Sequence, residues 1–160
     1  MNTEEQFLYE SNLIENETSD EAFEDAKMAW NYAVANKRKI NVQMILQIHR
    51  LLMKRLDPRI AGHLRMCDVW IGGNKKGFLT TGILEEQLEL VCQEINAKKE
   101  NPSESWCKEV HVMFEDIHPF EDGNGRVGRI LYNFHRLKLG LGIDVIWDDE
   151  KQDYYKWFKK

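Results

Sequence analysis

Residues 117–129 combine residue types and spacing that suit the binding of phosphates: Ile-His-Pro-Phe-Glu-Asp-Gly-Asn-Gly-Arg-Val-Gly-Arg. Gly123 and Gly125 lack a Cβ atom, so the backbone can turn sharply and present its N–H groups, to which a following helix would add the positive end of its dipole. Arg126 and Arg129 stand three residues apart and would share one face of that helix. The segment therefore predicts a site for more than one phosphate.

Two other side chains of this segment add reactive groups to a phosphate site. A carboxylate beside a cationic loop, as at Asp122, suits a Mg²⁺ ion that is shared with phosphate oxygens. His118 has an ordinary pKa near neutrality and could take the proton from a hydroxyl that attacks phosphorus, a step that contributes ~10²–10⁴-fold in rate. Together they indicate phosphoryl or nucleotidyl transfer from a magnesium nucleotide.

The rest of the chain predicts a mainly helical scaffold for this segment. With 160 residues, 42% of them hydrophobic and 31% charged, it has the size and composition of one globular unit. Between Pro58 and Thr81, glycines interrupt short apolar runs, which predicts a small β-hairpin with its turn at residues 74–77. Elsewhere apolar residues recur at helical spacing, and helices are expected over residues 18–36, 41–56, 83–96, 101–117 and 124–139, with a short one after residue 148.

Capping side chains set the expected ends of these helices. Thr18 with Glu21 three residues on matches a capping box, and Asn41 and Asn101 are expected N-caps. Gly140 is expected to end the helix that follows the glycine loop, because glycine adopts the left-handed C-cap conformation at little cost. Each cap is a separate expectation about where a helix begins or ends.

Charge and cysteine content exclude several classes of function. The 22 Lys and Arg against 27 Asp and Glu give a net charge of −5, so we expect neither a nucleic-acid partner nor a polybasic membrane surface. Three widely spaced cysteines form no CxxC pair, which favours a reducing compartment. The acidic amino terminus has no apolar run of signal-peptide length and no segment has the length of a membrane span. The expected location is the cytoplasm.

Residues 118–129 match the motif HPFx(D/E)GNGRxxR of the Fic family at each defined position. The segments around His49, at residues 69–73 and at residues 131–133 also resemble the Fic core, so the resemblance covers nearly the whole chain. It implies the Fic fold, a compact, mainly α helical bundle with one small β-hairpin called the flap. It also implies an enzyme that moves AMP from ATP onto a Ser, Thr or Tyr hydroxyl of a target protein.

The resemblance assigns a role to each motif residue. His118 becomes the general base on the target hydroxyl, and Asp122 holds Mg²⁺. The implied nucleotide-binding residues, which hold the α to γ phosphates, are Gly123, Asn124, Gly125, Arg126 and Arg129. The flap is expected to pair with an extended segment of the target. Its implied residues are Val69, Trp70, Ile71, Gly72 and Gly73.

A second motif near the amino terminus is implied to be inhibitory. Residues 11–16 match the family pattern (S/T)xxxE(G/N), in which Glu15 would pair with Arg129 and deny it to the γ-phosphate, while Ser11 would help to position the helix end. A charged hydrogen bond of this kind contributes about 1.5–3 kcal/mol. Residues 1–17 are then the inhibitory segment and residues 18–160 the Fic domain. The alternative is an acidic helix that merely covers the core with Leu13 and Ile14.

Several alternatives stay open from the sequence. The chain could transfer another nucleoside monophosphate or a phosphate, remove AMP from a target, or bind peptides without catalysis. Gly125 argues against the kinase-like branch of the family, which has lysine there. The target protein is not identified, and the chain is compatible with a homo-oligomer. A further pair, His111 and Glu115, has the spacing of two metal ligands but is expected to be a solvated pair on a helix.

The aromatic residues near the carboxyl end allow two interpretations. Tyr154, Tyr155 and Trp157 could border the adenine of a bound nucleotide, or they could pack a terminal helix onto the bundle. The tyrosines are also candidates for self-modification. Neither composition nor spacing decides between these roles, because both need the same aromatic side chains.

Overall fold

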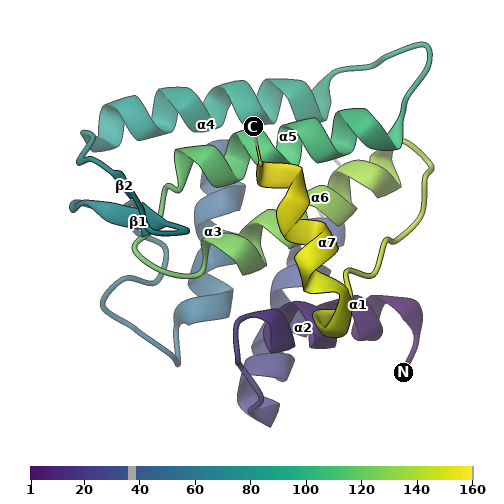
Figure 1. Ribbon diagram of the computed structural model, residues 1–160, viewed down its shortest axis with the longest axis horizontal. Helices are drawn as coiled ribbons and strands as arrows, with labels where there is room; N and C mark the ends of the chain where they lie inside the picture. Colours follow the sequence, from purple (N-terminus) through teal and green to yellow (C-terminus); the bar gives the residue numbers. More distant parts are fainter. Residues whose placement is uncertain (36–38, 160) are drawn as a thin grey trace.

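The structure is a computed structural model that describes residues 1–35 and 39–159, so the end of the expected helix at residue 36 lies outside the described residues. The described elements are helices α1 (Thr3–Ile14), α2 (Asp20–Ala35), α3 (Val42–Met53), α4 (Thr81–Asn96), α5 (Glu104–Ile117), α6 (Asn124–Lys138) and α7 (Lys151–Tyr155), strands β1 (Val69–Ile71) and β2 (Asn74–Lys76), and short 3-10 helices at Asp148–Glu150 and Lys156–Phe158 (Figure 1). The expected mainly helical bundle with one small hairpin is confirmed.

Helix α6 is the central element of the bundle. It packs against α1, α2, α3 and α5, and its side chains are buried from Asn124 to Arg136. It ends at Lys138, shortly before Gly140, whose φ of +74° has the predicted left-handed conformation. Because α6 begins within the glycine loop, the packing of this helix fixes the position of the loop.

The hairpin has its turn two residues earlier than predicted. The expected turn at residues 74–77 is wrong, because Asn74–Lys76 forms strand β2, which pairs antiparallel with β1 and places Ile71 opposite Asn74. The turn residues are Gly72 and Gly73, with φ of +53° and +83°. A two-residue turn that follows the twist of the strands needs positive φ at both positions, which two glycines supply without steric cost.

Two helix starts also differ from the predicted caps. Helix α2 is capped by Ser19 rather than Thr18, since the Ser19 Oγ accepts the backbone N–H three residues on (3.1 Å). Helix α5 is capped by Ser103 rather than Asn101, with the equivalent bond at 3.2 Å. In both cases the serine stands three residues before the first buried side chain of the helix, so tertiary packing selects the cap. The predicted N-cap Asn41 is confirmed.

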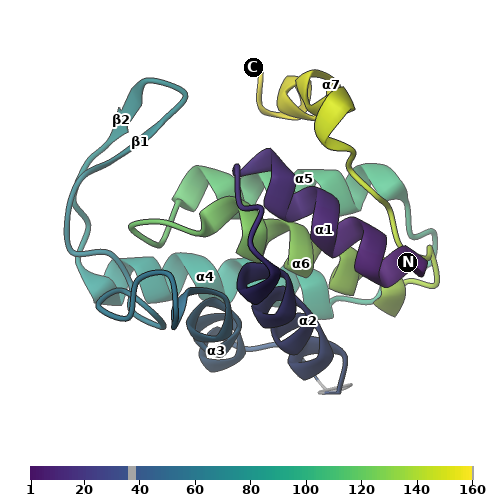
Figure 2. The same cartoon turned by 90° about the horizontal axis from the view of Figure 1, so that it is seen from below.

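Helix α1 and the carboxyl-terminal helices lie on the same side of the bundle. Helix α1 packs on α2 and α6 and also contacts the 3-10 helix at Asp148–Glu150. The hairpin and α7 project from the same side, with α1 near α7 (Figure 2). No helix in the described part of the chain is long and apolar enough to cross a membrane.

Candidate active site

His118 lies where α5 ends, in a backbone conformation that is uncommon for a residue with a Cβ. Its φ is +49° and ψ is 61°, in the left-handed region, and its N–H donates to the Phe114 carbonyl (3.2 Å). The imidazole Nδ1 lies 3.3 Å from the Glu115 carbonyl oxygen. Because a carbonyl only accepts, Nδ1 carries the hydrogen and Nε2 keeps a lone pair. Burial lowers the pKa of His118, so the ring is a neutral base at neutral pH.

The loop that follows is closed by its own side chains. Asn124 accepts the Phe120 N–H (2.9 Å) and donates to the Phe120 carbonyl (2.8 Å), which joins the two ends of the turn. The Phe120 ring stacks on His49 with a centroid distance of 3.8 Å. At Gly123, φ is +86° and a Cβ would lie 3.0 Å from the Met53 sulfur. The loop therefore needs glycine at this position, and Asn124 closes the loop with its side chain as well as supplying a backbone N–H.

Arg129 is held by the amino-terminal helix. Its side chain is 3% exposed; Nε donates to the Ser11 hydroxyl (2.7 Å), and Nη2 donates to the Ser11 carbonyl (3.0 Å) and to Glu15 Oε1 (2.7 Å). The predicted pairing of Glu15 with Arg129 is thus present in the structure. Ser11 was expected only to position the helix end, but it also bonds directly to the same guanidinium.

The Glu15 carboxylate lies over the start of α6. A Cβ atom at Gly125 would collide with Glu15 Oε1 and would lie 2.9 Å from Arg129 Nη1. The free N–H groups and the positive dipole end of a helix favour an anion at such a position. The carboxylate therefore occupies the place at which the sequence predicts a phosphate.

A hydrogen-bond chain links Arg129 to α5 and α7. Arg129 Nη1 lies 3.5 Å from the Tyr154 hydroxyl, which lies 2.7 Å from His111 Nε2, and His111 Nδ1 lies 3.1 Å from the Gly128 carbonyl. The carbonyl must accept from Nδ1–H, so Nε2 accepts from the Tyr154 O–H and the Tyr154 oxygen accepts from Arg129. Burial, with Arg129 adding to it, lowers the pKa of His111 to about 3, which keeps the ring neutral.

The expectation that His111 and Glu115 form a solvated pair is wrong, because both side chains are buried beneath α6. Glu115 is 8% exposed, and its Oε1 has no hydrogen-bond partner among the described residues. Gly128 makes room for it, since a Cβ there would collide with Glu115 Oε1. Burial raises the pKa of Glu115 to about 8, although Arg129 acts in the opposite direction, so the carboxyl is protonated at neutral pH. No group of three or more metal-binding side chains occurs in the described ranges.

One cavity of about 510 Å³ collects most of these groups. It is lined by residues from α1, the hairpin, α5, α6 and the carboxyl-terminal helices: Glu15, Ile71, Gly72, Glu115, His118, Gly125, Arg129, Tyr154, Tyr155 and Phe158. The structure thus brings the predicted base, Gly125 of the loop, one of the two predicted arginines and two flap residues together with two of the carboxyl-terminal tyrosines. Arg126 does not line this cavity, because its buried Nη2 lies 3.2 Å from the Met53 sulfur.

The raised pKa of Glu115 predicts how stability depends on pH. Its pKa is about 8 in the folded chain against an ordinary 4.5, so the folded chain retains a proton that the unfolded chain releases. Buried histidines with lowered pKa values act in the opposite direction as the unfolded chain loses their protons around pH 6.5, but they do so equally in a chain that lacks the Glu115 carboxyl. From pH 6.5 to 8 the unfolding free energy of the wild type should therefore fall relative to that of Glu115→Gln by up to about 1.4 kcal/mol per pH unit.

Denaturant titrations at several pH values check this dependence. The Glu115→Gln variant has no carboxyl to ionise at this position, so its profile contains only the contributions of the other groups. A difference between the two profiles that stays constant over this interval contradicts a protonated Glu115.

Comparison with known proteins identifies the family of this arrangement. The profile of the Fic/DOC family matches residues 39–135. Curated relatives include "Protein adenylyltransferase Fic" of Drosophila ananassae, 28% identical over 130 residues that make up 81% of this chain and 26% of the relative. The Drosophila mojavensis protein of the same name is 29% identical over 132 residues, with coverages of 81% and 26%. The chain spans about a quarter of the length of these relatives.

Solved structures agree with this assignment. Fic-1 from C. elegans superimposes with a TM-score of 0.76 at 20% identity, over 97% of this chain and 54% of that one. A Fic domain containing signaling protein from Bacteroides thetaiotaomicron gives 0.77 at 22% identity, over 96% and 69%. At these identities the superpositions establish the fold alone, which is the expected Fic fold. With the family profile covering more than half of its length, the chain belongs to the Fic/DOC family.

Proposed function

We propose that this chain transfers AMP from ATP to a Ser, Thr or Tyr hydroxyl of a target protein, and that Glu15 holds the enzyme in an inhibited state. The observation that carries the proposal is the cavity in which a neutral His118, Gly125 at the start of α6 and Arg129 meet. The relatives named protein adenylyltransferase support the choice of reaction. ATP is the proposed AMP donor, and a protein is the proposed acceptor.

In this proposal His118 takes the proton of the target hydroxyl. Its Nδ1–H is committed to the Glu115 carbonyl, so the basic nitrogen is Nε2, and the lowered pKa keeps it unprotonated at neutral pH. As the proton moves to Nε2, the hydroxyl oxygen attacks the α-phosphorus, the new P–O bond forms, and pyrophosphate leaves. The N–H groups at the start of α6 would stabilise the charge that develops on the phosphate oxygens.

Arg129 would hold the γ-phosphate once it is released from Glu15. Two parallel N–H groups of a guanidinium suit a phosphate, and a buried position strengthens the attraction. In the present structure those donors are taken by Ser11 and Glu15. We propose residues 1–17 as the inhibitory segment and residues 18–160 as the catalytic domain, since the segment ends at the residue that competes with the nucleotide.

The residues at the loop fit a magnesium ion that is shared with substrate phosphates. Asp122 is exposed, and its Oδ1 accepts the Gly123 N–H (2.8 Å), which leaves its second oxygen for a metal. A site with one protein carboxylate suits Mg²⁺, which usually keeps water and phosphate oxygens as its other ligands. Bound there, the ion would offset phosphate charge, and Asp122 would be its protein ligand.

The hairpin would dock the target beside this site. Ile71 and Gly72 line the cavity, Val69 is buried against the bundle, and Trp70 is 60% exposed. A two-stranded hairpin keeps unpaired N–H and C=O groups along its outer edges, which can pair with an extended segment of another protein. Main-chain pairing would place the target near His118, while exposed side chains such as Trp70 would select it.

Removing the inhibitory charge tests the regulation. The Glu15→Gln variant should transfer AMP roughly tenfold to a hundredfold faster than the wild type, because loss of a charged hydrogen bond of about 1.5–3 kcal/mol frees Arg129. Transfer is measured with ATP labelled in the α-phosphate, Mg²⁺ and cell lysate. Arg129→Ala, alone or with Glu15→Gln, should stay inactive because it loses the phosphate contact.

Glu24→Gln is the matched control for this experiment. It removes the same charge from an exposed side chain that pairs only with Lys27 among the ion pairs of the described residues, so it should leave the rate unchanged. Equal labelling by Glu15→Gln and the wild type would mean that α1 covers the core without regulating the enzyme. Mass spectrometry of the labelled protein distinguishes AMP from another transferred group.

Replacing the base tests the reaction itself. We expect His118→Ala, made in the Glu15→Gln background, to bind ATP as before but to transfer AMP at least about 10²-fold more slowly, since the ring contacts the hydroxyl and not the phosphates. Calorimetry gives the affinity and labelling gives the rate. His63→Ala, an exposed histidine outside this cavity, should change neither. Retained transfer in His118→Ala would remove this residue from the role of base.

A further inference from the structure

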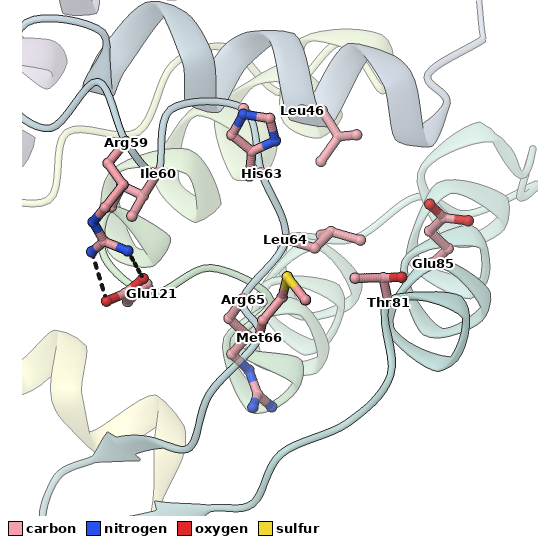
Figure 3. Close-up of a pocket in the computed structure, with 11 residues that line it drawn as sticks. Leu46, Arg59, Ile60, His63, Leu64, Arg65, Met66, Thr81, Glu85 and Glu121 are labelled. Carbon is pink, nitrogen blue, oxygen red and sulfur yellow. Dashed lines mark hydrogen bonds and ion pairs between the residues drawn. The ribbon is translucent and has the colours of Figure 1, made fainter.

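Arg65 is a buried arginine outside the family motif, between the hairpin and the histidine loop. It lies on the segment that leads from α3 to β1, and Figure 3 shows its side chain extending away from the pair of Arg59 and Glu121. Its residue exposure is only 2%. No carboxylate forms an ion pair with it among the described residues. Burying a cation without a carboxylate destabilises the fold unless other acceptors surround the charge, so the groups that Arg65 contacts indicate its role.

Those partners are main-chain carbonyls of two separate segments. Arg65 Nε donates to the His118 carbonyl (2.7 Å), and Nη1 donates to the carbonyls of Cys67 and Gly77 (both 2.9 Å). The Arg65 backbone N–H donates to the Pro119 carbonyl (2.9 Å). Cys67 precedes β1 and Gly77 follows β2 directly, so one guanidinium joins both ends of the hairpin to the peptide that follows the histidine.

Both segments need such a link. His118 has a positive φ, which a residue with a Cβ adopts only when its surroundings hold it there. A two-stranded hairpin is at best marginally stable in water without further support. The rigid fork of a guanidinium can bind several carbonyls at fixed relative positions, whereas the single ammonium of lysine cannot reproduce that geometry.

We propose that Arg65 is a positioning residue that ties both ends of the hairpin to the main chain of His118, so that a segment docked on the hairpin is presented to the histidine at a fixed distance. This inference rests on the proposed function, because it explains how a target hydroxyl is aligned with the base. It assigns Arg65 no contact with ATP, since its hydrogen-bond partners do not include residues 123–125 or Arg129.

The test compares Arg65→Gln and Arg65→Lys with a control that contacts the same loop. Arg59 binds Glu121 with two hydrogen bonds (3.2 and 2.9 Å) from an exposed position and bonds to no hairpin carbonyl that is described (Figure 3). Arg59→Gln therefore perturbs the loop without releasing the hairpin. All variants are made in the Glu15→Gln chain, and the measurements are amide exchange, the titration of the His118 ring by NMR, ATP affinity and AMP transfer.

In Arg65→Gln we expect amides of residues 69–76 to exchange at least about tenfold faster while those of α6 stay protected. The pKa of His118 should rise, because burial and then the positive charge of Arg65 lower it, and the substitution removes that charge while the background stays the same. AMP transfer should fall by about tenfold to a hundredfold from misalignment, with unchanged ATP affinity. Arg65→Lys keeps the cation, so it should leave the His118 pKa low while the amides of the hairpin still exchange faster. If Arg65→Gln does not fold, the amide exchange of Arg65→Lys alone tests the proposed link.

Wild-type exchange of the hairpin in Arg65→Lys, or equal loosening in Arg59→Gln, would overturn the proposal. The exchange and titration measurements do not need transfer activity. A chain that binds no ATP and transfers no AMP would therefore refute the proposed function while leaving the link between Arg65, the hairpin and His118 to be judged separately.

Discussion

A guanidinium buried at the start of the central helix is the constraint around which this structure is organised. Arg129 cannot remain inside the bundle without acceptors. These come from segments near both ends of the chain: Ser11 in α1, Glu15 directly after α1, and Tyr154 in α7. The end of α1 and helix α7 therefore come together at Arg129, near the start of α6. A phosphate could also compete with the Glu15 carboxylate for Arg129, because both anions accept hydrogen bonds from a guanidinium.

His118, the proposed base, is positioned by a second set of contacts that does not involve Arg129. The left-handed conformation of His118, the closure of the loop by Asn124 and the stacking of Phe120 on His49 fix the loop from within. Arg65 then joins this loop to the hairpin. Under the proposed function the architecture separates two tasks, since Glu15 would block the nucleotide through Arg129 while other contacts hold His118 and the hairpin.

Local sequence predicted the parts of the site that depend on short stretches of chain. The glycine loop and the start of α6 follow from residues at fixed spacing, whereas the pair of Glu15 with Arg129 was implied by the resemblance to the family pattern. The exposure of Glu115 was misjudged, because helical spacing shows which residues share a face but not that α6 covers this face with the glycine at residue 128. The hairpin turn was predicted at residues 74–77 instead of residues 72–73, because both segments contain glycine and fit a turn equally well by composition.

Other functional contacts had no signal in the sequence. Arg65 bonds to carbonyls, and main-chain acceptors leave no trace in residue types, so the link between residues 65 and 118 appears only in three dimensions. The chain from Arg129 through Tyr154 to His111 likewise joins three separated segments. Aromatic residues near the carboxyl end could be recognised as candidates for the nucleotide site or for packing, and the structure places Tyr154 both in the cavity and in the support of Arg129.

The most direct test of this account is a calorimetric comparison of ATP and AMP binding to the wild type and to Glu15→Gln, with Mg²⁺ present. If Glu15 competes with the terminal phosphate for Arg129, the variant should bind ATP roughly tenfold to a hundredfold more tightly, while its affinity for AMP, which lacks that phosphate, should not change. An equal gain for both nucleotides, or no gain for ATP, would contradict the claim that Glu15 holds the arginine that the nucleotide needs.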